Sequence, residues 1–338
     1  MTMPFFRLER PRSIADAVSI LAAHGPEAMV LAGGTDVVPN LQMKLFSPRV
    51  VVDIKLLTAA AGLASIEWSP QTGLRIGALV TLTAVCEAPF IRENFPVLAR
   101  AVSTIAGPLQ RNMGTLGGNL CLETRCLWYN QSHFWRASLG GCLKKDGAVC
   151  HVAPGGQRCW AVWSGDAAPA LLTLDAELEI AGPASRGFGT RRIPLAQFYK
   201  NDGMDRIALG RDELLTAVCI PARMAGRRGN YHKLRIRNSI DYPLAGVAVS
   251  MDVDSRGICR DARLALTGVN PAPLLVKEVA EWLIGQPPSP ELVERVSQAA
   301  IRAAKPLTTS ASTPVYRRDM VRVFTRRALE EAWKNGAA

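Results

Sequence analysis

The sequence predicts an α+β protein of two domains, with a cysteine-rich insertion in the first domain. Its 338 residues are about twice the length of a typical domain. Apolar runs with helical and with strand-like spacing are mixed through the first two thirds, whereas three strand-like runs precede the helical runs of the last third. Between these regions, residues 120–165 are rich in Cys, Trp and Gly and follow neither spacing. We expect this segment to have little regular structure of its own.

The N-terminal third alternates between predicted helices and buried strands. Ser13 and Gly25 bound a run of helical spacing and predict its N-cap and its stop. A strand is predicted from AMVLAGG (28–34), and a helix with Thr35 as its N-cap from TDVVPNLQMKL (35–45). The further predictions are a strand over 50–54, two short strands within 63–80, a helix over 94–104, and strands over 175–182 and 213–220.

The last third predicts a smaller α+β domain. A basic, Gly-containing segment over 221–230 is typical of a linker. Beyond it, strands are predicted over 231–237, 246–254 and 262–270, and helices over 276–285, 291–304 and about 314–334. Strands followed by helices predict a three-stranded antiparallel sheet covered by helices. We therefore place the domains at 1–222 and 229–338, with the insertion at about 120–165.

The chain has a net positive charge, and the surplus of basic residues is concentrated in two segments. Lys and Arg number 40 against 29 Asp and Glu, a net charge of +11, and apolar residues are 48% of the chain. This composition excludes a disordered or collagen-like chain. The surplus lies in two stripes, 222–237 and 316–327, which suit a solvated face, a subunit interface, an anionic small molecule or an acidic partner. No zinc finger or RNA-recognition signature is present, so no nucleic acid is expected.

The N-terminal sequence and the cysteines indicate in which cellular compartment we expect the protein. MTMPFFRLERPRS lacks an apolar signal region, and no apolar run reaches about 18 residues, so we expect a cytoplasmic protein that does not span a membrane. A reducing cytoplasm keeps thiols free, so clustered cysteines indicate metal or redox work before disulfides. The eight cysteines are Cys86, Cys121, Cys126, Cys142, Cys150, Cys159, Cys219 and Cys259.

Four of these cysteines are spaced through the insertion as Cys126-x15-Cys142-x7-Cys150-x8-Cys159. Four thiolates suit a [4Fe–4S] cluster or a zinc site with four cysteine ligands, although the spacing is that of neither a compact ferredoxin nor a zinc ribbon. Structural or free thiols are the alternative. His133 and His151 are candidates to replace a cysteine at zinc, or are surface residues, and Cys121 is a competing ligand or a buried thiol.

Two Gly-Gly turns are candidates for binding an anion. They are Ala32-Gly33-Gly34-Thr35-Asp36 and Thr115-Leu116-Gly117-Gly118-Asn119. Glycine lets the backbone approach a ligand and lets successive amides converge on an anion, so two such turns suit the two phosphates of a dinucleotide. Two ordinary tight turns are the alternative. Neither GxGxxG nor GxxxxGK[ST] occurs, so the usual nicotinamide and P-loop motifs are absent.

Together with GDAAPALLTLDA (165–176) and YHKLRIRNSIDYPLAGVAV (231–249), these turns resemble the FAD-binding medium (β) subunit of the molybdenum hydroxylase family, which includes xanthine dehydrogenase and carbon monoxide dehydrogenase. The resemblance spans the chain. It implies a two-part FAD-binding domain of the PCMH type and a C-terminal domain of the CO dehydrogenase flavoprotein type. It implies that both Gly-Gly turns hold the FAD pyrophosphate, with Asp166 and Lys233 near the flavin. A helix cap at Asp166 and a solvated strand residue at Lys233 are the alternatives.

The insertion resembles a narrower group. Between Asn119 and Asp166 lie 46 residues, where the typical subunit has almost none, and CLETRCLWYNQSHFWR (121–136) is similar to the β subunit of 4-hydroxybenzoyl-CoA reductase. That subunit carries an extra [4Fe–4S] cluster. The resemblance implies that Cys126, Cys142, Cys150 and Cys159 are its ligands and that Cys121 is not.

The resemblance implies an electron-transfer subunit with no catalytic residues of its own. A ferredoxin-like donor would supply the [4Fe–4S] cluster, and electrons would pass through FAD to a [2Fe–2S] small subunit and a molybdenum-cofactor large subunit, where 4-hydroxybenzoyl-CoA is dehydroxylated. Three alternatives remain: the FAD subunit of a xanthine, aldehyde or CO dehydrogenase-type hydroxylase, a different aromatic acyl-CoA reductase, and a zinc-stabilised binding protein without redox activity.

Overall fold

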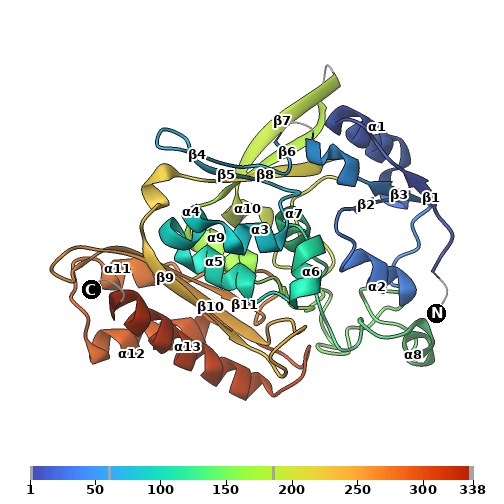
Figure 1. Ribbon diagram of the computed structural model, residues 1–338. Coiled ribbons are helices and arrows are strands. Elements are labelled where there is room, and N and C mark those ends of the chain that lie inside the picture. The colour runs from blue at the N-terminus through green and yellow to red at the C-terminus, as the bar shows by residue number, and fades with distance from the viewer. Residues whose placement is uncertain (1–2, 60–61, 185–186, 335–338) are drawn as a thin grey trace.

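The computed structural model describes residues 3–59, 62–184 and 187–334, which form three sheets and the helices around them (Figure 1). A three-stranded sheet and a five-stranded sheet belong to the first 222 residues, and a four-stranded sheet belongs to the last third. The fold is therefore the predicted α+β class. None of the helices within these ranges is both long and apolar enough to cross a membrane.

The three-stranded sheet is parallel and has its most buried strand in the middle. Its order is β1 (Arg7–Glu9), β3 (Val50–Asp53), β2 (Ala28–Leu31). Helix α1 (Ile14–His24) begins as predicted, since the Ser13 hydroxyl accepts from the Asp16 amide at 3.0 Å, and it ends at Gly25 with a φ of 48°. The prediction for the next helix is wrong at its start: α2 (Val37–Gln42) has Asp36 at the N-cap, and Thr35 lies in the preceding turn.

The five-stranded sheet is antiparallel, in the order β4 (Ile66–Ser69), β5 (Gly73–Gly77), β8 (Leu214–Ile220), β6 (Glu177–Ala184), β7 (Gly187–Pro194). Edge strand β7, GFGTRRIP, was not predicted, because it has no apolar alternation. Glu179 ties three strands together by accepting from Arg75 at 2.9 Å and from Arg192. Burial alone would raise the pKa of Glu179, but the hydrogen bonds from the two arginines outweigh it and lower the pKa.

Short helices fill the space between this sheet and the C-terminal sheet (Figure 1). They are α3 (Leu82–Glu87), α4 (Pro89–Asn94), α5 (Pro96–Ser103), α6 (Pro108–Met113), α7 (Leu116–Leu120), α9 (Ala167–Thr173) and α10 (Leu195–Phe198). Single 3-10 turns stand at Gly25–Glu27, Lys55–Ala59 and Ala222–Met224. Helix α5 is the helix predicted over 94–104, and α9 is buried along its whole length.

The C-terminal sheet contains the three predicted strands and one more. Its order is β12 (Leu274–Leu275), β11 (Cys259–Thr267), β10 (Ala245–Val253), β9 (Arg228–Leu234), all antiparallel. Helices α11 (Glu278–Leu283), α12 (Pro290–Ala303) and α13 (Pro314–Lys334) pack on one side (Figure 1). On the other side, Tyr231, Ala248 and Ala265 join the core of the first domain. The two domains therefore share one continuous apolar layer.

The insertion has little regular structure, as predicted. Within 121–165 the described elements amount to the six-residue helix α8 (His133–Ser138) and isolated bridges. The buried Arg136 guanidinium anchors α8 by donating to the carbonyl oxygens of Met43 at 3.2 Å and Lys44 at 2.9 Å. An arginine thus holds the insertion against the end of α2.

The two basic stripes are not simple solvated faces. Arg317 of α13 is fully buried, and its guanidinium donates to the carbonyl oxygens of Leu244 at 2.8 Å, Leu307 at 2.7 Å and Gly268. Burial lowers the pKa of Arg317 to about 10. Arg227 is also buried and pairs with Asp261 at 2.9 Å. The solvated-face interpretation is therefore wrong for these two arginines, because tertiary packing on β10 and β11 covers them.

Candidate functional site

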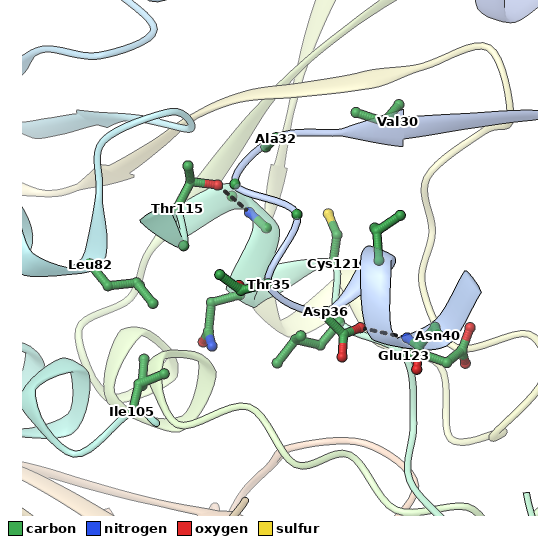
Figure 2. Close-up of a pocket in the computed structure, with 18 of the residues that line it drawn as sticks. Val30, Ala32, Thr35, Asp36, Asn40, Leu82, Ile105, Thr115, Cys121 and Glu123 are labelled. Carbon is green, nitrogen blue, oxygen red and sulfur yellow. Dashed lines mark hydrogen bonds between the residues drawn. The ribbon is translucent and has the colours of Figure 1, made fainter. Parts of the chain in front are cut away.

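A cavity of about 660 Å³ opens where the two Gly-Gly turns meet (Figure 2). Its volume lies within the roughly 300–1,000 Å³ usual for cofactor sites. The turn after β2 and helix α7 supply much of its wall, and segments 121–125 and 240–242 supply more. Nine of the predicted cofactor residues line it: Ala32, Gly33, Gly34, Thr35, Asp36, Thr115, Gly117, Gly118 and Asn119. Asp166 lines it too, whereas Leu116 and Lys233 do not.

The first turn lines this cavity, and its backbone amides have no acceptor in the described protein. Within the described chain, no hydrogen bond is donated by the backbone N–H groups of residues 33–36. Gly34 has a φ of 74°, a conformation that glycine adopts without strain. At Gly33, an added Cβ would lie 1.8 Å from the Met113 carbonyl oxygen, so glycine is required there by packing of the turn on α6. The free amides fit the predicted anion site.

The second turn differs from the first. Its amides already have protein acceptors: Leu116 donates to Val80 O and Gly117 to Ala78 O, both at 2.9 Å. The Gly118 amide donates to the Thr115 hydroxyl at 3.1 Å and the Asn119 amide to the Thr115 carbonyl at 2.9 Å. The interpretation of this turn as an amide cradle is therefore wrong, because the turn at 78–80 that follows β5 and the helix cap use these donors. Leu116 is fully buried in the core, away from the cavity.

Asp166, which lines the cavity, forms a buried pair with Lys233, which lies behind it. Lys233 Nζ lies 2.9 Å from Asp166 Oδ2 and 3.0 Å from the Thr104 carbonyl oxygen, and Tyr231 Oη donates to Asp166 Oδ1 at 2.6 Å. Burial raises the pKa of Asp166, and the Lys233 and Tyr231 contacts oppose that rise. Asp166 occupies the N-cap position of α9 but makes no capping bond there. Lys233 is buried, so the solvated-strand alternative is wrong.

Two residues of the wall were missed from the sequence. Arg125 and Tyr242 both bind the Asp36 carboxylate, Tyr242 Oη at 2.9 Å, and the Arg125 guanidinium lies 4.1 Å from the centre of the Tyr242 ring. Asn40 Nδ2 donates to the other Asp36 oxygen at 3.0 Å. Arg125 and Tyr242 lie inside the two family-like segments 121–136 and 231–249, but neither residue type marks a cavity by itself.

The four spaced cysteines meet at a second, smaller cavity of about 20 Å³. All four are buried and free, and Trp128, Tyr129, Lys144 and His151 also line this space. His151 Nε2 lies 2.7 Å from the Gly141 carbonyl oxygen, and His133 lies elsewhere, at the start of α8. Cys121 lines the larger cavity instead. The structure thus brings together the four predicted ligands and separates Cys121 from them.

Two of these thiols, Cys126 and Cys159, are harder to deprotonate than an ordinary cysteine. Burial raises the pKa of Cys126 to about 11, and it raises that of Cys159 as well. In the described ranges, no three His, Cys, Asp or Glu side chains are grouped so that they could hold a single metal ion. A single zinc ion needs its four sulfurs about 3.8 Å apart, from bonds of about 2.3 Å in a tetrahedron. The four free thiols line one cavity but form no such single-metal group.

The wall between the two cavities holds a buried ion pair. Glu123 lines the larger cavity and Lys144 lines the cysteine cavity, and Lys144 Nζ lies 2.6 Å from Glu123 Oε1. Burial alone would raise the pKa of Glu123, but Lys144 and Arg206 outweigh it and lower the pKa. Glu123 is therefore ionised at neutral pH.

Comparison with known proteins gives matches along nearly the whole chain. Residues 4–223 match the family model of the FAD binding domain in molybdopterin dehydrogenase, and residues 230–332 match that of the CO dehydrogenase flavoprotein C-terminal domain. The aldehyde oxidoreductase FAD-binding subunit PaoB of Escherichia coli (strain K12) is 34% identical over 292 residues, covering 84% of this chain and 87% of PaoB. The xanthine dehydrogenase FAD-binding subunit of Escherichia coli O157:H7 is 28% identical over 97% of this chain and 96% of its own. A chain of carbon monoxide dehydrogenase from Hydrogenophaga pseudoflava has a TM-score of 0.79 at 26% identity, over 98% and 99% of the two chains.

Proposed function

Because this chain belongs to the family of FAD-binding subunits of molybdopterin dehydrogenases, we propose that it holds FAD in the 660 Å³ cavity and serves as the electron-transfer subunit of a molybdenum-dependent oxidoreductase. The observation that carries the proposal is the first Gly-Gly turn, whose amides at residues 33–36 have no protein acceptor in the described chain and which lines a cavity of cofactor size. FAD, when bound, supplies one- and two-electron redox chemistry.

The residues of the cavity would hold FAD in different ways. The first turn would bind the pyrophosphate through its amides, and the second would allow close approach at Gly118, which is exposed to the cavity. Asp166 would contact the flavin directly, whereas Lys233 would act only by holding Asp166 in place. We place the domain boundary between residues 222 and 229, at the start of β9.

The relatives reported above indicate the type of complex. By their names they are subunits of aldehyde, xanthine and carbon monoxide oxidoreductases, so a hydroxylase of this type is favoured over 4-hydroxybenzoyl-CoA reductase as the complex that this chain serves. We propose a molybdenum-cofactor large subunit and a [2Fe–2S] small subunit as its partners. The family assignment replaces the alternative of a binding protein without redox activity. All eight cysteines are free, which fits a reducing cytoplasm.

Gly118→Leu tests the flavin site. A Cβ at Gly118 would meet only the Thr115 hydroxyl, at 3.0 Å, so the longer side chain would extend into the cavity rather than into the core. We expect less than about a tenth of the wild-type flavin after purification, with an unchanged unfolding midpoint. The control is Gly155→Leu on the insertion, where an added Cβ meets nothing within 4 Å. Full flavin content in Gly118→Leu would place the flavin elsewhere.

A second candidate function rests on the cysteine cavity. We propose that Cys126, Cys142, Cys150 and Cys159 bind a [4Fe–4S] cluster, which would make the chain a β subunit of the 4-hydroxybenzoyl-CoA reductase type with a ferredoxin-like donor. The support is that four free, buried thiols line one cavity. The cavity is small, so the thiols would have to rotate outward to admit a cluster. Such a cluster, when bound, supplies one-electron transfer at a potential set by its surroundings.

Iron and zinc content after anaerobic purification tests the cluster. We expect about four irons per chain in the wild type, and loss of most of this iron in Cys142→Ser. Cys86→Ser is the matched control, because Cys86 lies on α3 outside both cavities. Zinc in place of iron, or unchanged iron in Cys142→Ser, contradicts the proposal and leaves the hydroxylase-type subunit as the function.

A further inference from the structure

The wall between the two cavities contains the six residues 121–126 and the Lys144–Glu123 ion pair. Cys121 and Glu123 line the larger cavity, and Cys126 lines the cysteine cavity (Figure 2 shows the first two). Lys144 reaches back across this wall from the cysteine side to Glu123. The side chains of Lys144 and Glu123 are only 7% and 8% exposed, so their charges are little screened by water.

The Lys144 ammonium makes four contacts with the surrounding protein. Besides Glu123, it donates to the Gly203 carbonyl oxygen at 2.7 Å and to the Thr124 hydroxyl, and it lies 4.4 Å from the centre of the Tyr129 ring. These contacts fix a positive charge at the edge of the cysteine cavity. Arg206, whose guanidinium lies 3.6 Å from the other Glu123 oxygen, is the second cation at this carboxylate.

We propose that the Lys144–Glu123 pair tunes the two redox centres in opposite directions: Lys144 makes the group in the cysteine cavity easier to reduce, and Glu123 makes the flavin harder to reduce. The proposal rests on the second candidate function given above, since it requires the cluster as well as FAD. Each one-electron reduction adds a negative charge, which a nearby buried cation stabilises and a nearby carboxylate destabilises. The pair therefore shifts the difference between the two potentials in one direction, toward an electron on the cluster rather than on the flavin. Lys144 and Glu123 are positioning residues in this role and touch no reacting atom.

Redox titrations of the full chain loaded with FAD and cluster test the proposal, with EPR for the cluster and absorbance for the flavin. Lys144→Met is expected to make cluster reduction at least about tenfold less favourable, a shift of about 59 mV to lower potential. Glu123→Gln leaves the Lys144 charge without its closest counter-charge, so it is expected to shift the cluster to higher potential. It is also expected to raise the flavin potential. The two neutralising variants thus move the cluster in opposite directions, which loss of packing alone would not do.

The controls separate charge from structure. Lys144→Arg keeps the cation and is expected to retain the wild-type cluster potential. Lys145→Met removes the neighbouring charge, which pairs with Asp146 on the surface and lines neither cavity, and is expected to change nothing. If Lys144→Met does not fold, the upward shift in Glu123→Gln still decides the question. Unshifted potentials, or shifts of the same sign in both neutralising variants, overturn the inference, whereas a wild type without iron or flavin overturns the proposed function instead.

Discussion

Replacing one member of the Asp166–Lys233 pair should lower the folding free energy more, per charge removed, than replacing both members together. The two side chains are 4% and 2% exposed and lie 2.9 Å apart. Asp166→Asn leaves a buried ammonium without a counter-charge, and Lys233→Met leaves a buried carboxylate, so each is expected to lose about 3–5 kcal/mol of folding free energy. If the sites were independent, the double variant would lose about 6–10 kcal/mol. Because the double variant buries no lone charge, we expect it to lose no more than either single variant.

Urea unfolding of the flavin-free protein, followed by tryptophan fluorescence, measures this double-mutant cycle. The expected coupling energy is about 3 kcal/mol or more. Tyr231 still donates to the substituted side chain in Asp166→Asn, so its 2.6 Å contact does not complicate the comparison. The pairing would be refuted if the double variant lost the sum of the two single-variant losses of unfolding free energy to within about 0.5 kcal/mol. A loss below about 1 kcal/mol for Lys233→Met would refute it as well.

Three further predictions concern Arg317, Glu179 and Gly33. Arg317→Met removes a buried guanidinium that donates to three carbonyl oxygens and should lower the unfolding free energy by about 3–5 kcal/mol in urea titrations. Arg327→Met, on the exposed side of the same helix, should change it by less than about 0.5 kcal/mol. The pKa of Glu179 is lower in the folded protein, so its ionised form stabilises the fold above the unfolded pKa of about 4.3, and this stabilisation is lost as the pH falls through the folded pKa. The difference in unfolding free energy between wild type and Glu179→Gln should therefore shrink below about pH 4. A difference that does not change with pH would contradict the ion pairs. Gly33→Ala should destabilise the flavin-free protein, because its Cβ would collide with the Met113 carbonyl oxygen at 1.8 Å, and an unchanged melting temperature would show that the turn can move aside.

Local patterns predicted much of the fold. Helix α1 follows from its Ser13 cap, its apolar spacing and the Gly25 stop, all of which lie within a few residues of one another. Strands β10 and β11 follow from apolar runs of their own. Strand β7 could not be predicted in the same way, because its partner β6 supplies the hydrogen bonds while its own sequence, GFGTRRIP, has no apolar alternation.

The site was predictable as a set of residues but not as an arrangement. Both Gly-Gly turns stand out in the sequence and both line the cavity. Only the structure distinguishes them, since the acceptors that occupy the second turn are Ala78 and Val80, more than 30 residues away. Arg125 and Tyr242 are 117 residues apart and become part of the wall only because both bind Asp36.

Residue type, local spacing and the family-like motifs are properties of the chain itself, and they were sufficient for the fold class, the insertion and the four spaced cysteines. Burial and pairing of charge are different, because they depend on which distant segments pack together. Lys233 looks like a strand lysine until Asp166, 67 residues earlier, is found against it. Lys144 looks like its neighbour Lys145 until Glu123 is found 2.6 Å away in a wall between two cavities. The free energy of a charge is set by its surroundings in three dimensions, so these roles emerge only from the folded chain.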